Sequence, residues 1–350
     1  MSSSGPLFGS LRTADGFPLG SAALHPDWPE GRFNVAGMFW FDPVILFLLE
    51  TAQLGFDCRV GIESIHGAPL VLWNGARPAA EELLPADLSA RLDSLYSRGV
   101  GCFLTFTRHL LEAGDLGDAD GNFLLDNLAR RPDLNGVIVS SELLSKYIAG
   151  RYPALRQVAP VAKVVAEGGR GNASYYNELG RRFYRYAVHP DDGLDPRLLD
   201  QLDRTKAEII LNEDCLRGCS LPECPDEALA PAQGSLGDQP AAPAPGDSLL
   251  RRRLAERELE LLLAACPAQR LNRQIGKRQR NGNLTRSEVK SLYDRGFRHF
   301  TIQARGDNAF CLAYDLVRYT LEPDFAAPLV YRKLCPVIGR CFPAGQAHAR

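Results

Sequence analysis

Short apolar runs and longer amphipathic runs alternate along the chain from Phe33 onward. The short runs are rich in Val, Ile, Phe and Tyr and are bounded by Gly, Pro or charged residues, a pattern typical of buried β-strands. We expect eight strands, at residues 33–39, 58–65, 100–107, 136–141, 155–165, 184–190, 207–213 and 297–304.

The longer runs carry helix signals at their ends. Pro43 follows Asp42, which is the usual order of a capping residue and a first-turn proline. The segment TRSE at 285–288 has the spacing of a capping box, and Gly296 ends the helix that follows it. We expect helices at residues 43–54, 86–98, 122–131, 141–151, 174–182, 196–206, 249–265, 287–295 and 308–319.

Strict alternation of strand and helix predicts parallel strands joined by crossover helices. Eight such units are the number that closes a (β/α)8 barrel of the TIM type, so this α/β fold is our prediction. An open doubly wound sheet is the alternative. No GxGxxG segment follows the first strand, so the sequence lacks the usual dinucleotide-binding signature of such sheets.

The domain organisation follows from where the alternation starts, breaks and stops. Residues 1–32 are rich in Gly, Pro and Ser and are expected to form a loosely ordered N-terminal tail. The barrel is expected to span 33–325, and 326–350 to form a C-terminal tail. Residues 225–248 are a low-complexity stretch of Ala, Pro and Gly, which predicts a disordered insertion after the seventh strand.

Composition narrows the class of protein. The formal net charge is −2 over 350 residues, so there is no basic excess of the kind that nucleic-acid binding produces. For that reason we expect no nucleic-acid partner. We also expect no membrane span, because charged residues interrupt the apolar stretches. The first residues lack the pattern of a signal peptide, and nine cysteines is an odd number. A cytoplasmic protein with free or metal-bound thiols is therefore expected.

Candidate chemistry is expected at the carboxyl ends of the strands, where barrels of this type hold their active sites. His189 ends a predicted strand and could serve as a general base or a metal ligand. Glu63 and Glu213 also fall at predicted strand ends and are candidates for acid–base catalysis. For each residue the alternative is an ordinary loop hydrogen bond.

Substrate-binding candidates share a position at a strand end or in the segment WNGAR after the second strand. They are Trp73, Asn74, Arg77, Thr105, Asn212, Gln303 and Arg305. The guanidinium groups of Arg77 and Arg305 are suited to a carboxylate or a phosphate. Packing of Trp73 at the barrel rim and turn formation by Asn74 are the alternatives.

Three cysteines, Cys215, Cys219 and Cys224, lie in the segment NEDCLRGCSLPEC after the seventh strand. Thiolates are soft ligands that bind zinc or iron–sulfur clusters. A redox pair is disfavoured because no CxxC is present, and Pro222 stands where a CxxxCxxC signature needs its third cysteine. We expect a [4Fe–4S] cluster or zinc whose fourth ligand is unassigned; three free thiols are the alternative.

The strand order together with Asn212, Glu213, Cys215 and Cys219 resembles the peptidase U32-like barrels. That family includes collagenase-type peptidases and iron–sulfur proteins associated with oxygen-independent hydroxylation. The resemblance implies a barrel whose cysteines hold a [4Fe–4S] cluster. The cysteine spacing here departs from that of the hydroxylases, so hydroxylase and hydrolase both stay open.

Two functions from different classes fit these observations. The first is a metal- or iron–sulfur-dependent barrel enzyme that acts on a small polar or anionic metabolite. The second is a non-catalytic accessory barrel that holds a structural metal. In that second case the amphipathic helix expected at 249–265 would dock a partner protein.

Overall fold

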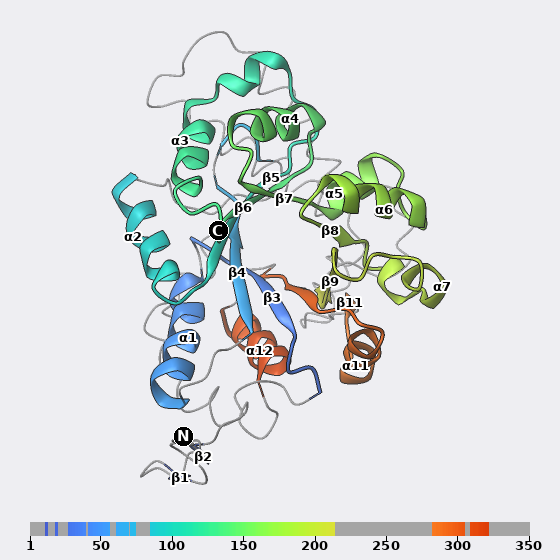
Figure 1. Cartoon of the computed structure of the whole chain (residues 1–350). Helices are drawn as coiled ribbons and strands as arrows, with labels where there is room; N and C mark the ends of the chain where they lie inside the picture. The colour runs from blue at the N-terminus through green and yellow to red at the C-terminus, as the bar shows by residue number, and fades with distance from the viewer. Residues whose placement is uncertain are drawn as a thin grey trace, which may run out of the picture.

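The computed structural model describes the greater part of the predicted barrel (Figure 1). The described residues are 11–12, 18–19, 27–39, 41–56, 61–69, 71–74, 85–213, 282–304 and 309–321.

Eight parallel strands close into a barrel, which confirms the predicted (β/α)8 fold. Their bounds are β3 Arg32–Ala36, β4 Ile62–Gly67, β5 Gly101–Phe106, β6 Gly136–Val139, β7 Arg156–Ala159, β8 Arg185–Val188, β9 Ala207–Ile210 and β12 His299–Ile302. Each strand pairs with the next in this order, and β12 pairs with both β9 and β3 to complete the ring.

Helices surround the ring of strands, as Figure 1 shows. They are α1 Asp42–Phe56, α2 Pro85–Tyr96, α3 Ala119–Leu128, α4 Glu142–Arg151, α5 Val161–Ala166, α6 Ala173–Arg182, α7 Pro196–Leu199, α11 Arg286–Asp294 and α12 Ala309–Thr320. The capping box predicted at the start of α11 is present: the Thr285 side chain accepts from the Glu288 amide, and the Glu288 side chain accepts from the Thr285 amide.

The main hydrophobic core lies between the strands and the helices, and a second, smaller one lies inside the barrel. Phe103, Ile138 and Val158 form the smaller cluster, and their strands β5, β6 and β7 are neighbours. They face inward as one apolar half of the interior. The other half of the interior is polar.

Glu208 is the centre of the polar half and is only 3% exposed. Its carboxylate accepts a hydrogen bond from the Asn34 amide at 3.2 Å and a short one from the Thr301 hydroxyl. Arg185, on the neighbouring strand β8, interacts with Glu208 electrostatically. These partners matter because a carboxylate buried without them would cost several kcal/mol, at least about 3.

The strand bounds differ from the expected ones, and three of the differences affect candidate site residues or the path of the chain. The run 155–165 divides, because Pro160 caps a new helix: its carbonyl accepts from the Lys163 amide, and α5 follows. The run 207–213 leaves the barrel after Ile210, and Asn212–Glu213 forms the separate strand β10. The second strand begins at Ile62, so Glu63 lies near its start.

Strand β10 pairs antiparallel with β11, Gly282–Asn283. Residues 214–281, which contain the expected insertion at 225–248 and the expected helix at 249–265, lie outside the described residues. So does the expected tail at 326–350. The two described residues that flank this segment, Glu213 and Gly282, therefore belong to paired strands.

The region expected to be an N-terminal tail contains two short paired strands, β1 Leu11–Arg12 and β2 Pro18–Leu19. Trp28, also in this region, is 2% exposed and donates its indole N–H to the Tyr319 carbonyl at 2.7 Å. None of the described helices is both long enough and apolar enough to cross a membrane.

Close approach between β5 and the loop before β6 generates a stability prediction. A Cβ on Gly101 would lie 2.0 Å from the Leu134 carbonyl oxygen, which is a backbone atom and cannot turn aside. We expect Gly101→Ala to lower the free energy of unfolding by about 2 kcal/mol or more, measured by urea denaturation. Gly150→Ala is the control, since a Cβ there meets nothing within 4 Å in helix α4; an equal loss in both variants would contradict the steric argument.

Candidate functional site

All eight barrel strands run parallel, so their carboxyl ends meet at one mouth of the barrel, called here the C-terminal mouth. Polar side chains lie at or just after several of these ends, among them His66, Thr105, Ser140, His189 and Gln303. This mouth is the candidate active site, because barrels of this type carry their chemistry there.

His189 follows the end of β8, and its imidazole is held in one orientation. Its Nδ1 accepts a hydrogen bond from the Asp191 amide at 3.2 Å. Burial lowers the pKa of His189, and the nearby charge of Arg170 lowers it further, so the ring is neutral at pH 7. A neutral ring whose Nδ1 accepts carries its proton on Nε2, which makes Nε2–H a hydrogen-bond donor.

Tyr176 and Asp192 hold the backbone of His189 in place through hydrogen bonds. The Tyr176 hydroxyl accepts from the His189 amide at 3.0 Å and donates to the Asp192 carboxylate at 2.7 Å. Asp192 also accepts from the Gly171 amide at 2.8 Å. Burial raises the pKa of Tyr176, so its hydroxyl keeps the proton that this chain of bonds requires. Sequence reasoning missed Tyr176, since nothing in a helix sequence shows which strand end its hydroxyl will reach.

Glu213 lies close enough to His189 to interact with it electrostatically. It is 4% exposed and belongs to β10, two residues before Cys215. The structure therefore brings together two of the three residues that the sequence proposed as catalytic.

The third, Glu63, lies at the opposite mouth. It accepts two hydrogen bonds from the Arg185 guanidinium, at 2.7 and 3.0 Å. Burial alone would raise the pKa of Glu63, but the contacts with Arg185 outweigh it and the pKa is lowered. Both residues sit at the starts of their strands, so Glu63 is part of an ion pair at the N-terminal mouth and is remote from His189.

Asn212 was expected to bind substrate, but its side chain is committed to the fold. Its amide group donates to the Gln303 carbonyl at 2.8 Å and to the Asp315 carboxylate at 2.7 Å, and its carbonyl accepts from the Gln303 amide at 2.6 Å. These three bonds join the ends of β9 and β12 to helix α12. Asn212 is a clamp between elements, with both amide donors engaged.

Trp73 is also part of the fold. It is 0% exposed, donates its indole N–H to the Asp115 carbonyl at 2.7 Å and packs edge-on against Phe106. It therefore cannot stack on a substrate at the rim. Asn74 and Thr105 do meet: the Thr105 hydroxyl lies 3.3 Å from the Asn74 side-chain oxygen and 3.2 Å from the Gly67 carbonyl.

His66 is a polar residue at this mouth that the sequence did not single out as catalytic. Its Nδ1 lies 2.9 Å from the side-chain oxygen of Asn34, whose amide nitrogen donates to Glu208. Because that oxygen can only accept, the network assigns the Nδ1 proton to His66. His66 is thereby linked to the polar half of the barrel interior.

A second polar cluster surrounds Lys163 at the ends of β6 and β7. Lys163 is 0% exposed, donates to the Ser140 carbonyl at 3.1 Å and pairs with Glu167 at 2.6 Å. Burial would raise the pKa of Glu167, but hydrogen bonds from Lys163 and Tyr175 outweigh it and lower the pKa. Lys163 is thus neutralised by fold contacts.

The remaining candidates, Arg77, Arg305, Cys215, Cys219 and Cys224, lie outside the described residues. Within the described part of the chain, no group of three or more His, Cys, Asp or Glu side chains is placed to hold a metal ion.

Comparison with known proteins gives little beyond the fold. No family model matches the sequence, and no curated protein matches it. The fold resembles the solved structure of the U32 peptidase Mk0906, with 13% sequence identity and a TM-score of 0.43, over 79% of this chain and 93% of that one. A likeness at this level transfers no activity.

The Asn212 clamp yields a prediction that separates folding from binding. Asn212→Ala leaves the Gln303 amide without its acceptor and removes a donor from the buried Asp315 carboxylate, so we expect a loss of about 3 kcal/mol in unfolding free energy. Asn177→Ala is the matched control, since Asn177 makes two hydrogen bonds at the surface; its cost should be about 1 kcal/mol. Urea denaturation of both variants checks this, and an unchanged stability in Asn212→Ala would contradict the clamp.

Proposed function

We propose that the chain is a metal- or iron–sulfur-dependent barrel enzyme that acts on a small polar or anionic metabolite at the C-terminal mouth. The observation that carries the proposal is the neutral, oriented imidazole of His189, which interacts electrostatically with Glu213 at the point where the cysteine-containing segment begins. A surface histidine without function needs no such support from Tyr176 and Asp192.

Chain connectivity supports the cofactor part of the proposal. Cys215 follows Glu213 by two residues, which keeps their Cα atoms within about 7 Å of each other. The pairing of β10 with β11 fixes both ends of residues 214–281 beside β9 and β12. Cys215, Cys219 and Cys224 would hold the metal or the cluster, which would supply Lewis-acid or electron-transfer chemistry when bound.

The described residues have separate roles in this proposal. The Nε2–H of His189 donates a hydrogen bond to a substrate oxygen on which negative charge develops, as an oxyanion donor does. Glu213 is the acceptor for a proton from the substrate. His66, whose Nδ1 proton points to Asn34, lies at the same mouth.

Substrate contacts complete the proposed site. Thr105 and Asn74 supply a hydroxyl and an amide on the β5 side of the mouth, and Gln303 lies at the end of β12. Arg305 follows Gln303 by two residues and would bind an anionic group, as would Arg77. A partner protein is the alternative ligand, but no described residue favours it.

The cofactor is tested by anaerobic purification, a visible absorption spectrum and analysis of iron, sulfide and zinc. We expect about four irons and four sulfides per chain, or about one zinc, and loss of that metal in Cys215→Ser. Cys311→Ser is the control, because Cys311 lies in helix α12. Wild-type protein that is folded, colourless and free of metal would contradict the cofactor.

The donor role of His189 is tested by incubating the purified protein with a mixture of small anionic metabolites and following each by mass spectrometry. His189→Ala should slow consumption of the substrate by about 100-fold, the usual effect of losing one such donor. His189→Gln keeps an N–H donor and should lose less. Lys290→Ala, on α11, is the control. Equal rates for wild type and His189→Ala would contradict the role.

A further inference from the structure

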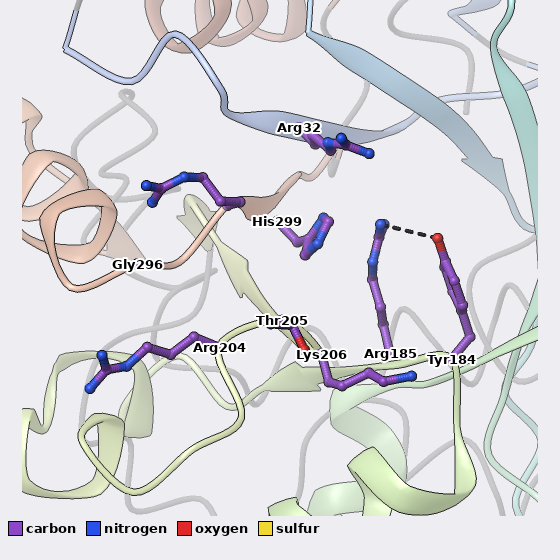
Figure 2. Close-up of a pocket in the computed structure, with 9 residues that line it drawn as sticks. Arg32, Tyr184, Arg185, Arg204, Thr205, Lys206, Gly296 and His299 are labelled. Atoms are coloured by element: carbon purple, nitrogen blue, oxygen red, sulfur yellow. Dashed lines mark hydrogen bonds between the residues drawn. The ribbon is translucent and has the colours of Figure 1, made fainter.

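The N-terminal mouth of the barrel, at the opposite end from the proposed active site, contains a cavity of about 350 Å³ (Figure 2). It opens where β3, β8, β9 and β12 begin, and its lining includes Arg32, Tyr184, Arg185, Lys206 and His299. This volume is at the lower end of the range for small-molecule sites.

Positive charge gathers at this cavity, and it is only partly matched by carboxylates outside the lining: Arg204 pairs with Asp200 and Arg298 pairs with Glu30. Five of its lining residues are Arg or Lys, and none is Asp or Glu. Glu63, a carboxylate at this mouth, is already held by two hydrogen bonds from Arg185. Arg32 reaches Glu63 only at 3.8 Å, and its side chain is 62% exposed.

Lys206 adds a cation that the fold does not neutralise. Within the described residues, no carboxylate lies within 4 Å of its ammonium group. Instead, Lys206 lies over the ring of Tyr184 with its Nζ 5.8 Å from the ring centre. Arg185 and Arg156 contact the same ring, with guanidinium carbons 4.8 and 4.7 Å from its centre.

Three cations around one aromatic ring repel one another, and each cation–π contact recovers only about 1 kcal/mol. Arg156 is not among the lining residues, but an anion in the cavity would attract Arg185 and Lys206 and offset part of this repulsion. Figure 2 shows Arg185 and Lys206 on the same side of the cavity as Tyr184, with His299 near its centre and Arg204 extending away. Arg32 and Lys206 lie on opposite sides of this view with Arg185 between them, so a ligand that contacts all three must extend across the cavity.

We propose that the N-terminal mouth binds a small molecule bearing a phosphate group, with Arg32, Arg185 and Lys206 as its cationic ligands. Two guanidinium groups and one ammonium group suit a group with two negative charges and three acceptor oxygens, whereas a single carboxylate offers one charge and two oxygens. The concave cavity favours a small ligand over a nucleic-acid backbone, which is contacted along an extended basic surface.

His299 supplies an independent reporter of occupancy. Its Nδ1 makes no hydrogen bond within the described part of the chain and lies 3.8 Å from Glu63. Burial lowers the pKa of His299 to about 4, and the positive charges of Arg185 and Arg32 act in the same direction. The negative charge of Glu63 opposes this shift but does not cancel it. A phosphate group placed among these cations reduces the positive potential at the ring, so binding should raise the pKa of His299.

The proposal is tested by calorimetric titration of the full chain with pyrophosphate, inorganic phosphate and citrate, and with a short DNA duplex as the macromolecular polyanion. We expect pyrophosphate and phosphate to bind, and Lys206→Ala and Arg32→Ala each to weaken binding about tenfold, the effect of losing one charge-assisted contact. Arg204→Ala removes the same charge from the same rim, but its side chain extends away, so its effect should be within about twofold.

The histidine signals of the wild type, followed by NMR across pH with and without pyrophosphate, should show one residue whose titration moves to higher pH; His299→Gln identifies it. Equal weakening by Arg204→Ala and Lys206→Ala, citrate binding tighter than phosphate, or DNA binding tighter than pyrophosphate would each overturn the proposal. Arg185 is left intact because its removal would bury Glu63 unpaired. The site is separate from the C-terminal mouth, so Cys215 and His189 variants should bind pyrophosphate as the wild type does.

Discussion

Burial of the Glu208 carboxylate inside the barrel is the constraint on which the rest of this molecule depends. A charge at 3% exposure must be compensated by neighbours that reach it across the interior. Asn34 and Thr301 donate to it, and Arg185 supplies the opposite charge from the neighbouring strand. The strands β3, β8, β9 and β12 therefore carry a polar face inside the barrel, while β5, β6 and β7 carry an apolar one.

The same network links the two mouths. At one end, Glu63 accepts two hydrogen bonds from Arg185. Burial would lower the pKa of Arg185, but the hydrogen bonds to Glu63 and the charges of Glu63 and Glu208 outweigh it and raise the pKa. At the other end, the side-chain oxygen of Asn34 accepts a hydrogen bond from Nδ1–H of His66. The cationic cavity and the proposed active site are thus separate sites whose supporting residues are linked by hydrogen bonds and by the electrostatic interaction between Arg185 and Glu208.

The strand pattern predicted the fold because barrel closure depends on the count and order of strands, which periodicity reveals directly. It could not predict the ends of the strands where the pattern is ambiguous. The run CRVGIESI suggested that Glu63 ends a strand, but the pairing register between β3 and β4 shifts at Phe33 and Asn34, and the strand starts at Ile62. Because β4 runs from Ile62 to Gly67, Glu63 lies near its start, at the mouth opposite to the expected one.

Side-chain roles were predictable only where backbone position decides them. His189 was found from its place after a strand, whereas its tautomer depends on the Asp191 amide and its backbone is held by Tyr176, and neither contact can be read from the strand pattern. Trp73 and Asn212 have side chains typical of binding sites, yet one is buried at 0% exposure and the other is used to join β9, β12 and α12. Sequence alone does not show which polar groups the fold itself consumes.

The pairing of β10 with β11 also bears on how the barrel folds. Closing the ring requires β12 to pair with β3, and these two strands are far apart in sequence. Contacts of this kind slow folding, because closing a long loop costs conformational entropy. Once Asn212 and Glu213 have paired with Asn283 and Gly282, residues 214–281 no longer lengthen the loop that must close. The short antiparallel pair therefore reduces the length of chain that must be ordered before β12 meets β3. Changing the length of residues 214–281 should then alter the rate at which β10 and β11 pair more than it alters the stability of the folded barrel.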